Sequence, residues 1–94
     1  MLENFIYTNI DWDNLPKQET QNRVMVFFSA NEDGKVDRVE VARKSDNDIF
    51  NQEAVRVIKL IPDWNVIYLK GQFSREQFAM TIVFSEENRE KYGK

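Results

Sequence analysis

The sequence has no cysteine and no histidine among its 94 residues. Without cysteine the chain has neither disulfides nor a thiolate nucleophile, and its cellular compartment is left open. Without histidine it lacks the usual general base near neutral pH and the commonest ligand of transition metals. Most enzyme classes use at least one of these groups, so we predict a protein that is not an enzyme and that binds no cofactor.

Glycine, long apolar runs and basic charge are scarce as well. The three glycines stand far apart, which excludes a glycine-rich loop around a phosphate. No apolar run approaches the roughly 18 residues of a membrane-spanning helix, and the N-terminus lacks the pattern of a signal peptide. The net charge is −3 and the basic residues are scattered, so we predict no binding to nucleic acid.

Acidic residues are plentiful, but they do not form a recognisable site. Residues 31–37 place oxygen-bearing side chains around Gly34, as calcium loops do, but lack the alternating ligand order and the closing glutamate of such loops. Two acidic pairs lie in polar turns, where we expect solvated side chains rather than a catalytic pair: Glu32 with Asp33, and Asp46 with Asp48. We therefore predict no catalytic residue and no metal site.

What the sequence does contain is a β-hairpin over residues 23–43. Alternate residues of the first arm are apolar and share one face, and those between them are also largely apolar: Val24, Val26, Phe28 and Ala30, then Met25, Phe27 and Ser29. A strand that is apolar on both faces is expected at the centre of a sheet. Gly34 suits the turn because glycine adopts a positive φ. In the second arm Val36 is out of phase with Val39, which predicts a bulge near Asp37.

Helical spacing is found on both sides of the hairpin. Residues 2–10 predict a short helix, and a second helix is predicted from an N-cap at Asn47 or Asp48 to the stop signal at Pro62. The apolar stripe of the second helix comprises Phe50, Ala54, Val57, Ile58 and Ile61, while Asn51, Gln52, Arg56 and Lys59 are expected to face outward. After the first helix we expect Trp12 and Leu15 to cover the core, followed by a polar loop over 17–22.

The last predicted strand covers Arg75 to Phe84. Phe78, Met80, Ile82 and Phe84 alternate toward one buried face, and Gln77, Ala79, Thr81 and Val83 share the other. An extended segment over 64–68 and a turn over 70–72 precede it. The sequence thus predicts an α+β fold, with a three-stranded antiparallel sheet in the order second, first, third and two helices on one face. We expect one domain over residues 1–84 and a charged, frayed tail over 85–94.

An ordered set of these residues resembles the TonB C-terminal domain family, most closely its versions in the Bacteroidetes. The resemblance covers about Phe5 to Phe84. Its elements are Asn9-Ile10, Trp12, the alternating Val24, Val26 and Phe28, Asp33-Gly34 with Val36, Val39 and Val41, Ser45, Glu53-Ala54, Pro62-x-Trp64, Gly71 and Ile82-x-Phe84. Four positions depart from the family pattern: Asp13, Asn22, Val66 and Glu76.

The resemblance implies a periplasmic domain of an energy transducer that is anchored in the inner membrane by a segment N-terminal to Met1. It implies that the domain captures the N-terminal peptide of a TonB-dependent outer-membrane receptor as a strand added to residues 75–84, in support of active transport. It also implies contact with inner-membrane proton-channel proteins through the missing N-terminal part.

We assign the partner-binding residues accordingly, on the open face of the last strand and at one secondary contact: Arg75, Gln77, Ala79, Thr81, Val83 and Trp12. Two other functions stay open, namely an accessory interaction or sensing domain with another partner, and a small ligand-binding domain or enzyme. The two free edges of the predicted sheet also predict a strand-exchanged homodimer, which sedimentation at high protein concentration would reveal.

Overall fold

The computed structural model describes residues 2–17, 21–64 and 66–93. In chain order its elements are α1 (Leu2–Asn9), the 3-10 helix η1 (Trp12–Asn14), β1 (Asn22–Ala30), β2 (Val36–Arg43), α2 (Asp48–Lys59), β3 (Ile67–Leu69), β4 (Gln72–Ser74), β5 (Phe78–Phe84) and α3 (Glu86–Tyr92). No helix in the described ranges has the length and apolar character that a membrane span needs. Part of the polar loop predicted over 17–22, residues 18–20, lies outside the described ranges.

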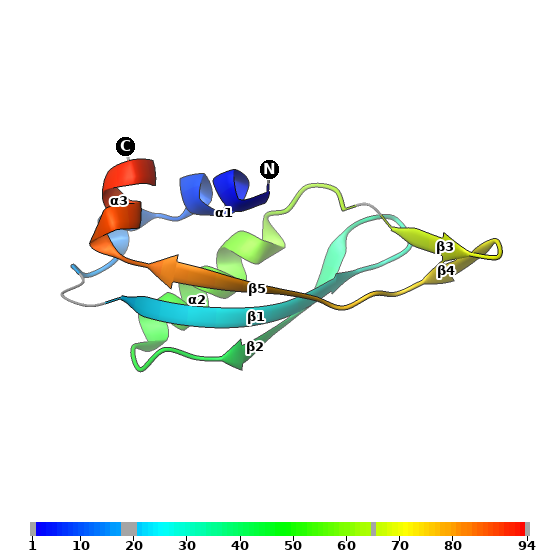
Figure 1. The fold of residues 1–94 in the computed structure, drawn as a ribbon, viewed down its shortest axis with the longest axis horizontal. Coiled ribbons are helices and arrows are strands. Elements are labelled where there is room, and N and C mark those ends of the chain that lie inside the picture. The colour runs from blue at the N-terminus through cyan, green and yellow to red at the C-terminus, as the bar shows by residue number, and fades with distance from the viewer. Residues whose placement is uncertain (1, 18–20, 65, 94) are drawn as a thin grey trace.

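The main sheet confirms the predicted α+β architecture. Its three antiparallel strands lie in the order β2-β1-β5, and helices cover one face (Figure 1). The bulge is where the valine phase placed it: Ser29 pairs with Arg38 and Ala30 with Val36, which leaves Asp37 as the extra residue. A second register shift, near the start of β1, was not predicted.

The turn between β1 and β2 depends on Asn31 and Gly34. The Asn31 side-chain oxygen accepts hydrogen bonds from the backbone N–H groups of Asp33 (2.9 Å) and Lys35 (3.1 Å), as an asparagine in a turn commonly does. Gly34 has a φ of 81°, in the left-handed region that favours glycine. Its carbonyl accepts a hydrogen bond from the N–H of Trp64 (2.8 Å), so the turn also anchors the segment that follows α2.

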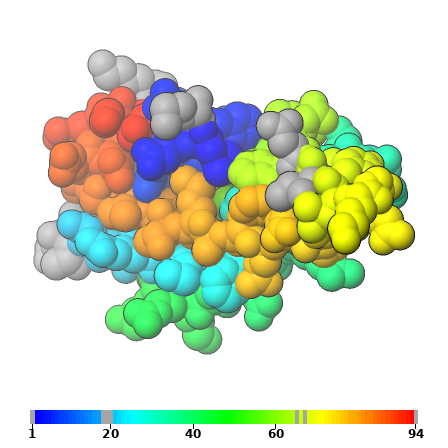
Figure 2. Space-filling view, turned by 45° about the vertical axis from the view of Figure 1, so that its right-hand side comes forward, coloured from blue at the N-terminus to red at the C-terminus, as the bar shows by residue number. Residues whose placement is uncertain are grey.

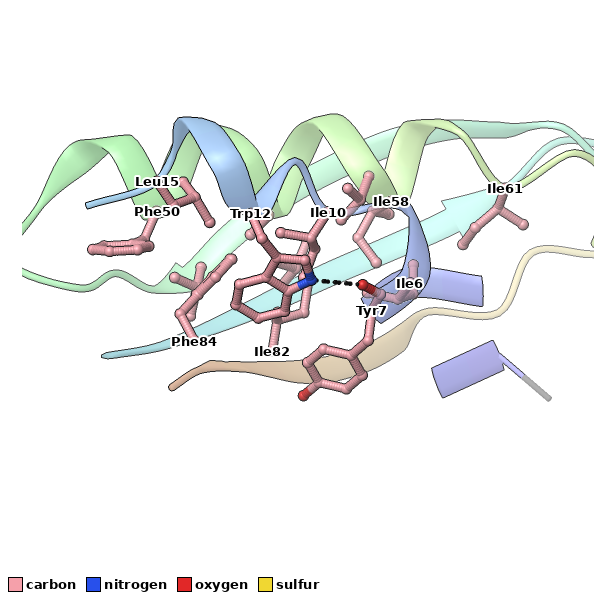
Figure 3. Packing of buried hydrophobic residues seen from close by; sticks show 14 of the residues in the cluster. Ile6, Tyr7, Ile10, Trp12, Leu15, Phe50, Ile58, Ile61, Ile82 and Phe84 are labelled. Carbon is pink, nitrogen blue, oxygen red and sulfur yellow. Dashed lines mark hydrogen bonds between the residues drawn. The ribbon is translucent and has the colours of Figure 1, made fainter. Parts of the chain in front are cut away.

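The core lies between the sheet and the helices α1 and α2 (Figure 3). Its largest fully buried side chains come from α1, β1, α2 and β5: Phe50, Phe84, Ile6, Ile58, Ile82, Val24, Val26 and Val57. Trp12 and Leu15 are buried against this cluster, which confirms that they cover the core. The apolar face of β5 and the stripe of α2 therefore meet as their periodicities predict.

Asn51 corrects the predicted outer face of α2, because it is only 6 % exposed. Its side-chain oxygen accepts a hydrogen bond from the N–H of Ser45 (2.7 Å), and its side-chain nitrogen donates to the Ser45 carbonyl (3.1 Å). Asn51 thus bonds both backbone groups of one residue in the β2–α2 loop. Asn51 was predicted to face solvent because it is polar and lies beside the apolar stripe. The β2–α2 loop instead provides hydrogen-bond partners that allow its side chain to be buried.

A small hairpin covers residues 67–74, where the sequence predicted an extended segment over 64–68 and a turn over 70–72; residue 65 of that segment lies outside the described ranges. β3 and β4 pair through a two-residue turn in which Lys70 (φ 55°) and Gly71 (φ 78°) both have positive φ, and the hairpin projects from one end of the molecule (Figure 1). β5 then begins at Phe78 rather than at Arg75. Residues 75–77 connect β4 to β5 and pair with neither β1 nor β3.

The frayed tail predicted over 85–94 is wrong for residues 86–92, which form α3. Ser85 is the N-cap and accepts a hydrogen bond from the N–H of Asn88 (3.1 Å). Arg89 donates to the carbonyls of Trp12, Leu15 and Pro16. The cap and the acidic first turn at Glu86 and Glu87 were visible in the sequence, but these tertiary bonds were not.

Candidate binding edge of the sheet

β5 is an outer strand of the main sheet, since it pairs with β1 and with no other described strand. One set of its side chains, Phe78, Met80, Ile82 and Phe84, packs toward the core cluster. The alternating set points to the open face, where Ala79 and Thr81 are exposed and Val83 is half-buried. The core therefore holds β5 in place while its outer edge and open face stay at the surface.

The hydrogen bonds of Val83 show which backbone groups of β5 point away from β1. Its N–H donates to the hydroxyl oxygen of Tyr7 (3.0 Å), and its carbonyl accepts a hydrogen bond from the side-chain nitrogen of Asn88 (2.8 Å). Both partners come from helices outside the sheet, so the polar groups of Val83 face away from β1. Because this direction alternates along a strand, the N–H and C=O groups of Ala79 and Thr81 face outward too.

The outward groups of Ala79 and Thr81 are the candidate site. Within residues 2–17, 21–64 and 66–93, no hydrogen bond from outside the main sheet reaches them. Two donors and two acceptors are thus presented in a row, with a spacing fixed by a strand anchored in the core. Such an edge can pair with an extended segment of another chain.

Arg75, one of the predicted partner-binding residues, lies before β5 and not on this edge. Its guanidinium donates to both carboxylate oxygens of Asp37 (2.7 and 3.2 Å) and to the hydroxyl of Ser29 (2.9 Å). This pairing lowers the pKa of Asp37 and raises the pKa of Arg75. The two charges tie the β4–β5 connection to the bulge of β2.

Gln77 is exposed in the same connection, one residue before β5. With Arg75 and Phe27 it lines a shallow groove of about 590 Å³ on the open face of the sheet, beside the exposed residues Asp37 and Glu40. Among the described residues, no three acidic side chains are close enough together to hold a metal ion. Gln77 therefore lies beside this edge but contributes no backbone pairing from β5 itself.

Trp12, predicted as a secondary partner contact, is only 4 % exposed. The indole N–H donates to the Tyr7 carbonyl (3.0 Å), and the ring packs edge-on against Phe84 at a centroid distance of 6.1 Å (Figure 3). The Arg89 guanidinium lies 5.8 Å from the ring centroid. Trp12 therefore connects α1, β5 and α3.

Tyr7 and Asn88 are the residues at this edge that sequence reasoning missed. Tyr7 lies 76 positions from Val83 along the chain, and Asn88 was placed in a tail without structure. Neither residue belongs to a motif with a known spacing. Their place beside the strand follows only from the packing of α1 and α3.

Comparison with known proteins gives one kind of match. A protein-family model described as Gram-negative bacterial TonB protein C-terminal matches residues 12–85. No curated protein and no solved structure matches the chain. The matched range contains the whole main sheet and α2.

Proposed function

Because the chain belongs to the family of C-terminal domains of Gram-negative bacterial TonB proteins, we propose that it captures the N-terminal segment of an outer-membrane receptor by adding it as a strand to β5. Domains of this family are periplasmic protein-interaction modules of energy transducers, and outer-membrane receptors are their general partners. On this proposal the domain works in the periplasm, linked to an inner-membrane anchor, and the captured strand transmits energy for active transport.

The observation that carries the proposal is the free outer edge at Ala79 and Thr81. Backbone pairing at these residues needs no particular side chain on the partner, so it suits a domain that serves more than one receptor. The side chains of Ala79 and Thr81 are exposed beside the added strand and would add modest selectivity. We expect weak binding, because a short disordered segment loses conformational entropy when it becomes a strand.

A titration of the isotope-labelled chain with synthetic N-terminal peptides of outer-membrane receptors tests this function. We expect amide chemical shifts to change chiefly along residues 78–82, because the peptide would hydrogen-bond to that edge. N-methylation of the peptide amides that face β5 should abolish the changes, whereas N-methylation of the alternate amides should not. Changes confined to the 31–35 turn or to α2, or none at millimolar peptide, would reject the proposal and favour an accessory domain with another partner.

A pair of substitutions at Thr81 sharpens the test. Thr81→Pro removes one outward N–H while the bonds of Met80 and Ile82 toward β1 remain, as is tolerated on an edge strand. We expect Thr81→Pro to weaken peptide binding at least about tenfold, since it loses a hydrogen bond and its ring crowds the added strand. Thr81→Val keeps the N–H and nearly the same shape, so its affinity should match that of the unmodified chain.

A further inference from the structure

The edge of β5 is closed at one end by side chains of two helices. At Val83 the Tyr7 hydroxyl oxygen occupies the outward N–H at 3.0 Å, and the Asn88 side-chain nitrogen occupies the outward carbonyl at 2.8 Å. These are the same two groups that an added strand would use after pairing with Thr81. We call Tyr7 and Asn88 the edge cap.

Tyr7 is fixed in this position by its own packing. It is 8 % exposed, and its ring stacks on Tyr92 of α3 with centroids 5.1 Å apart and planes 18° apart. Its carbonyl accepts the indole N–H of Trp12. Burial raises the pKa of the Tyr7 phenol, and its hydroxyl oxygen accepts from the Val83 N–H.

Asn88 is fixed by the anchorage of α3. The helix starts at the Ser85 cap, one turn before Asn88. Its Arg89 donates to the carbonyls of Trp12, Leu15 (3.1 Å) and Pro16 (3.0 Å), far away in the sequence. Figure 2 shows the red α3 and the blue α1 against the orange segment that contains β5. Both residues of the edge cap are therefore held in place by helices that are packed and hydrogen-bonded within the domain.

From this arrangement we propose that Tyr7 and Asn88 act as positioning residues that set the register and the limit of the captured strand, an inference that rests on the proposed function. The strand pairs with Ala79 and Thr81 and stops before Val83. Before Phe78, at the other end of β5, the chain runs through the connecting residues 75–77 to the β3–β4 hairpin (Figure 1). The partner is thus an extended segment that pairs with only the two outward-facing residues Ala79 and Thr81, over about 7 Å of β5. The rest of the segment passes toward the hairpin.

Amide hydrogen exchange on the 94-residue chain without peptide tests the edge cap by itself. The Val83 N–H should exchange at least about tenfold more slowly than the N–H groups of Ala79 and Thr81, because only Val83 has a partner. Tyr7→Phe keeps the stacked ring and removes the hydroxyl oxygen, so it should raise Val83 exchange to the level of Thr81. Tyr68→Phe, which removes an exposed hydroxyl on the hairpin, is the matched control and should change none of these rates.

The peptide titration then tests the register. In the unmodified chain, peptide should protect Ala79 and Thr81 while the Val83 amide stays unchanged. In Tyr7→Phe/Asn88→Ala, protection should extend to Val83, and binding should tighten about fivefold or more, as one further hydrogen-bonded residue allows.

The outcomes separate the two ideas. Fast Val83 exchange in the free unmodified chain, or peptide protection of Val83 with the edge cap intact, overturns the inference. Unchanged register and affinity in Tyr7→Phe/Asn88→Ala overturns it as well. If no variant binds any receptor peptide, the proposed function falls and the register with it, while the exchange rates of the free chain still decide whether the edge cap exists.

Discussion

Replacing Ile58 with alanine is expected to lower the free energy of unfolding by about 2–5 kcal/mol. Ile58 is 0 % exposed and lies in α2, within the core cluster between this helix and the sheet (Figure 3). The substitution removes buried methyl and methylene groups and leaves a cavity that the surrounding side chains fill only in part. Urea unfolding followed by circular dichroism measures the loss as a lower midpoint with an unchanged slope.

Ile49 supplies the matched control in the same helix. It is 47 % exposed, so Ile49→Ala deletes the same atoms from a site that solvent already reaches. We expect this substitution to change stability by less than about 1 kcal/mol. Equal losses at the two positions would show that α2 does not present Ile58 to the sheet, and would contradict the core described above.

Gly34→Ala is expected to destabilise the domain by about 2–5 kcal/mol, through two effects that add. The φ of 81° strains any residue with a Cβ. A Cβ at this position would also lie 2.7 Å from the carbonyl oxygen of Trp64, a backbone atom rather than the end of a flexible side chain. Relief of that overlap would pull Trp64 from its edge-on contacts with Phe28 (5.2 Å) and Phe78 (4.9 Å).

Gly71 separates these two effects. Its φ of 78° is nearly the same, but nothing lies within 4 Å of a Cβ built there. Gly71→Ala should therefore cost only the conformational strain, about 1–2 kcal/mol, and the difference between the two variants in urea unfolding measures the overlap with Trp64. If Gly34→Ala is no more harmful than Gly71→Ala, the backbone of Trp64 is not docked on the turn.

For the candidate site, the sequence predicted the edge strand but not which of its residues have outward backbone groups free for pairing. Alternation identified Ala79 and Thr81 as open-face residues of an edge strand, and the structure confirms their place on β5. The sequence could not show that Arg75 is paired with Asp37, since the two residues lie 38 positions apart and no local signal links them. The same is true of Trp12, whose burial depends on contacts with distant elements.

By itself the sequence determined the features that follow from local periodicity and backbone preference. The two-residue alternation of β1 and β5, the helical spacing of α2, the turn at Gly34 and the bulge at Asp37 are all written in short stretches of chain. Side-chain direction repeats every 2 or about 3.6 residues, so burial of one face fixes these elements wherever a core forms. The order β2-β1-β5 follows, because the helix between the hairpin and the last strand lets that strand return beside β1.

Only the tertiary structure decided where polar groups find their partners. Asn51 is buried because its side chain forms hydrogen bonds with the backbone N–H and carbonyl of Ser45. The helix α3 is held in place because Arg89 donates to carbonyls more than 70 positions away. The outward N–H and carbonyl of Val83 are occupied because side chains of α1 and α3 form hydrogen bonds with them. A hydrogen bond depends on two groups coming within about 3 Å, and the spacing of residues along the chain does not say which distant groups will do so.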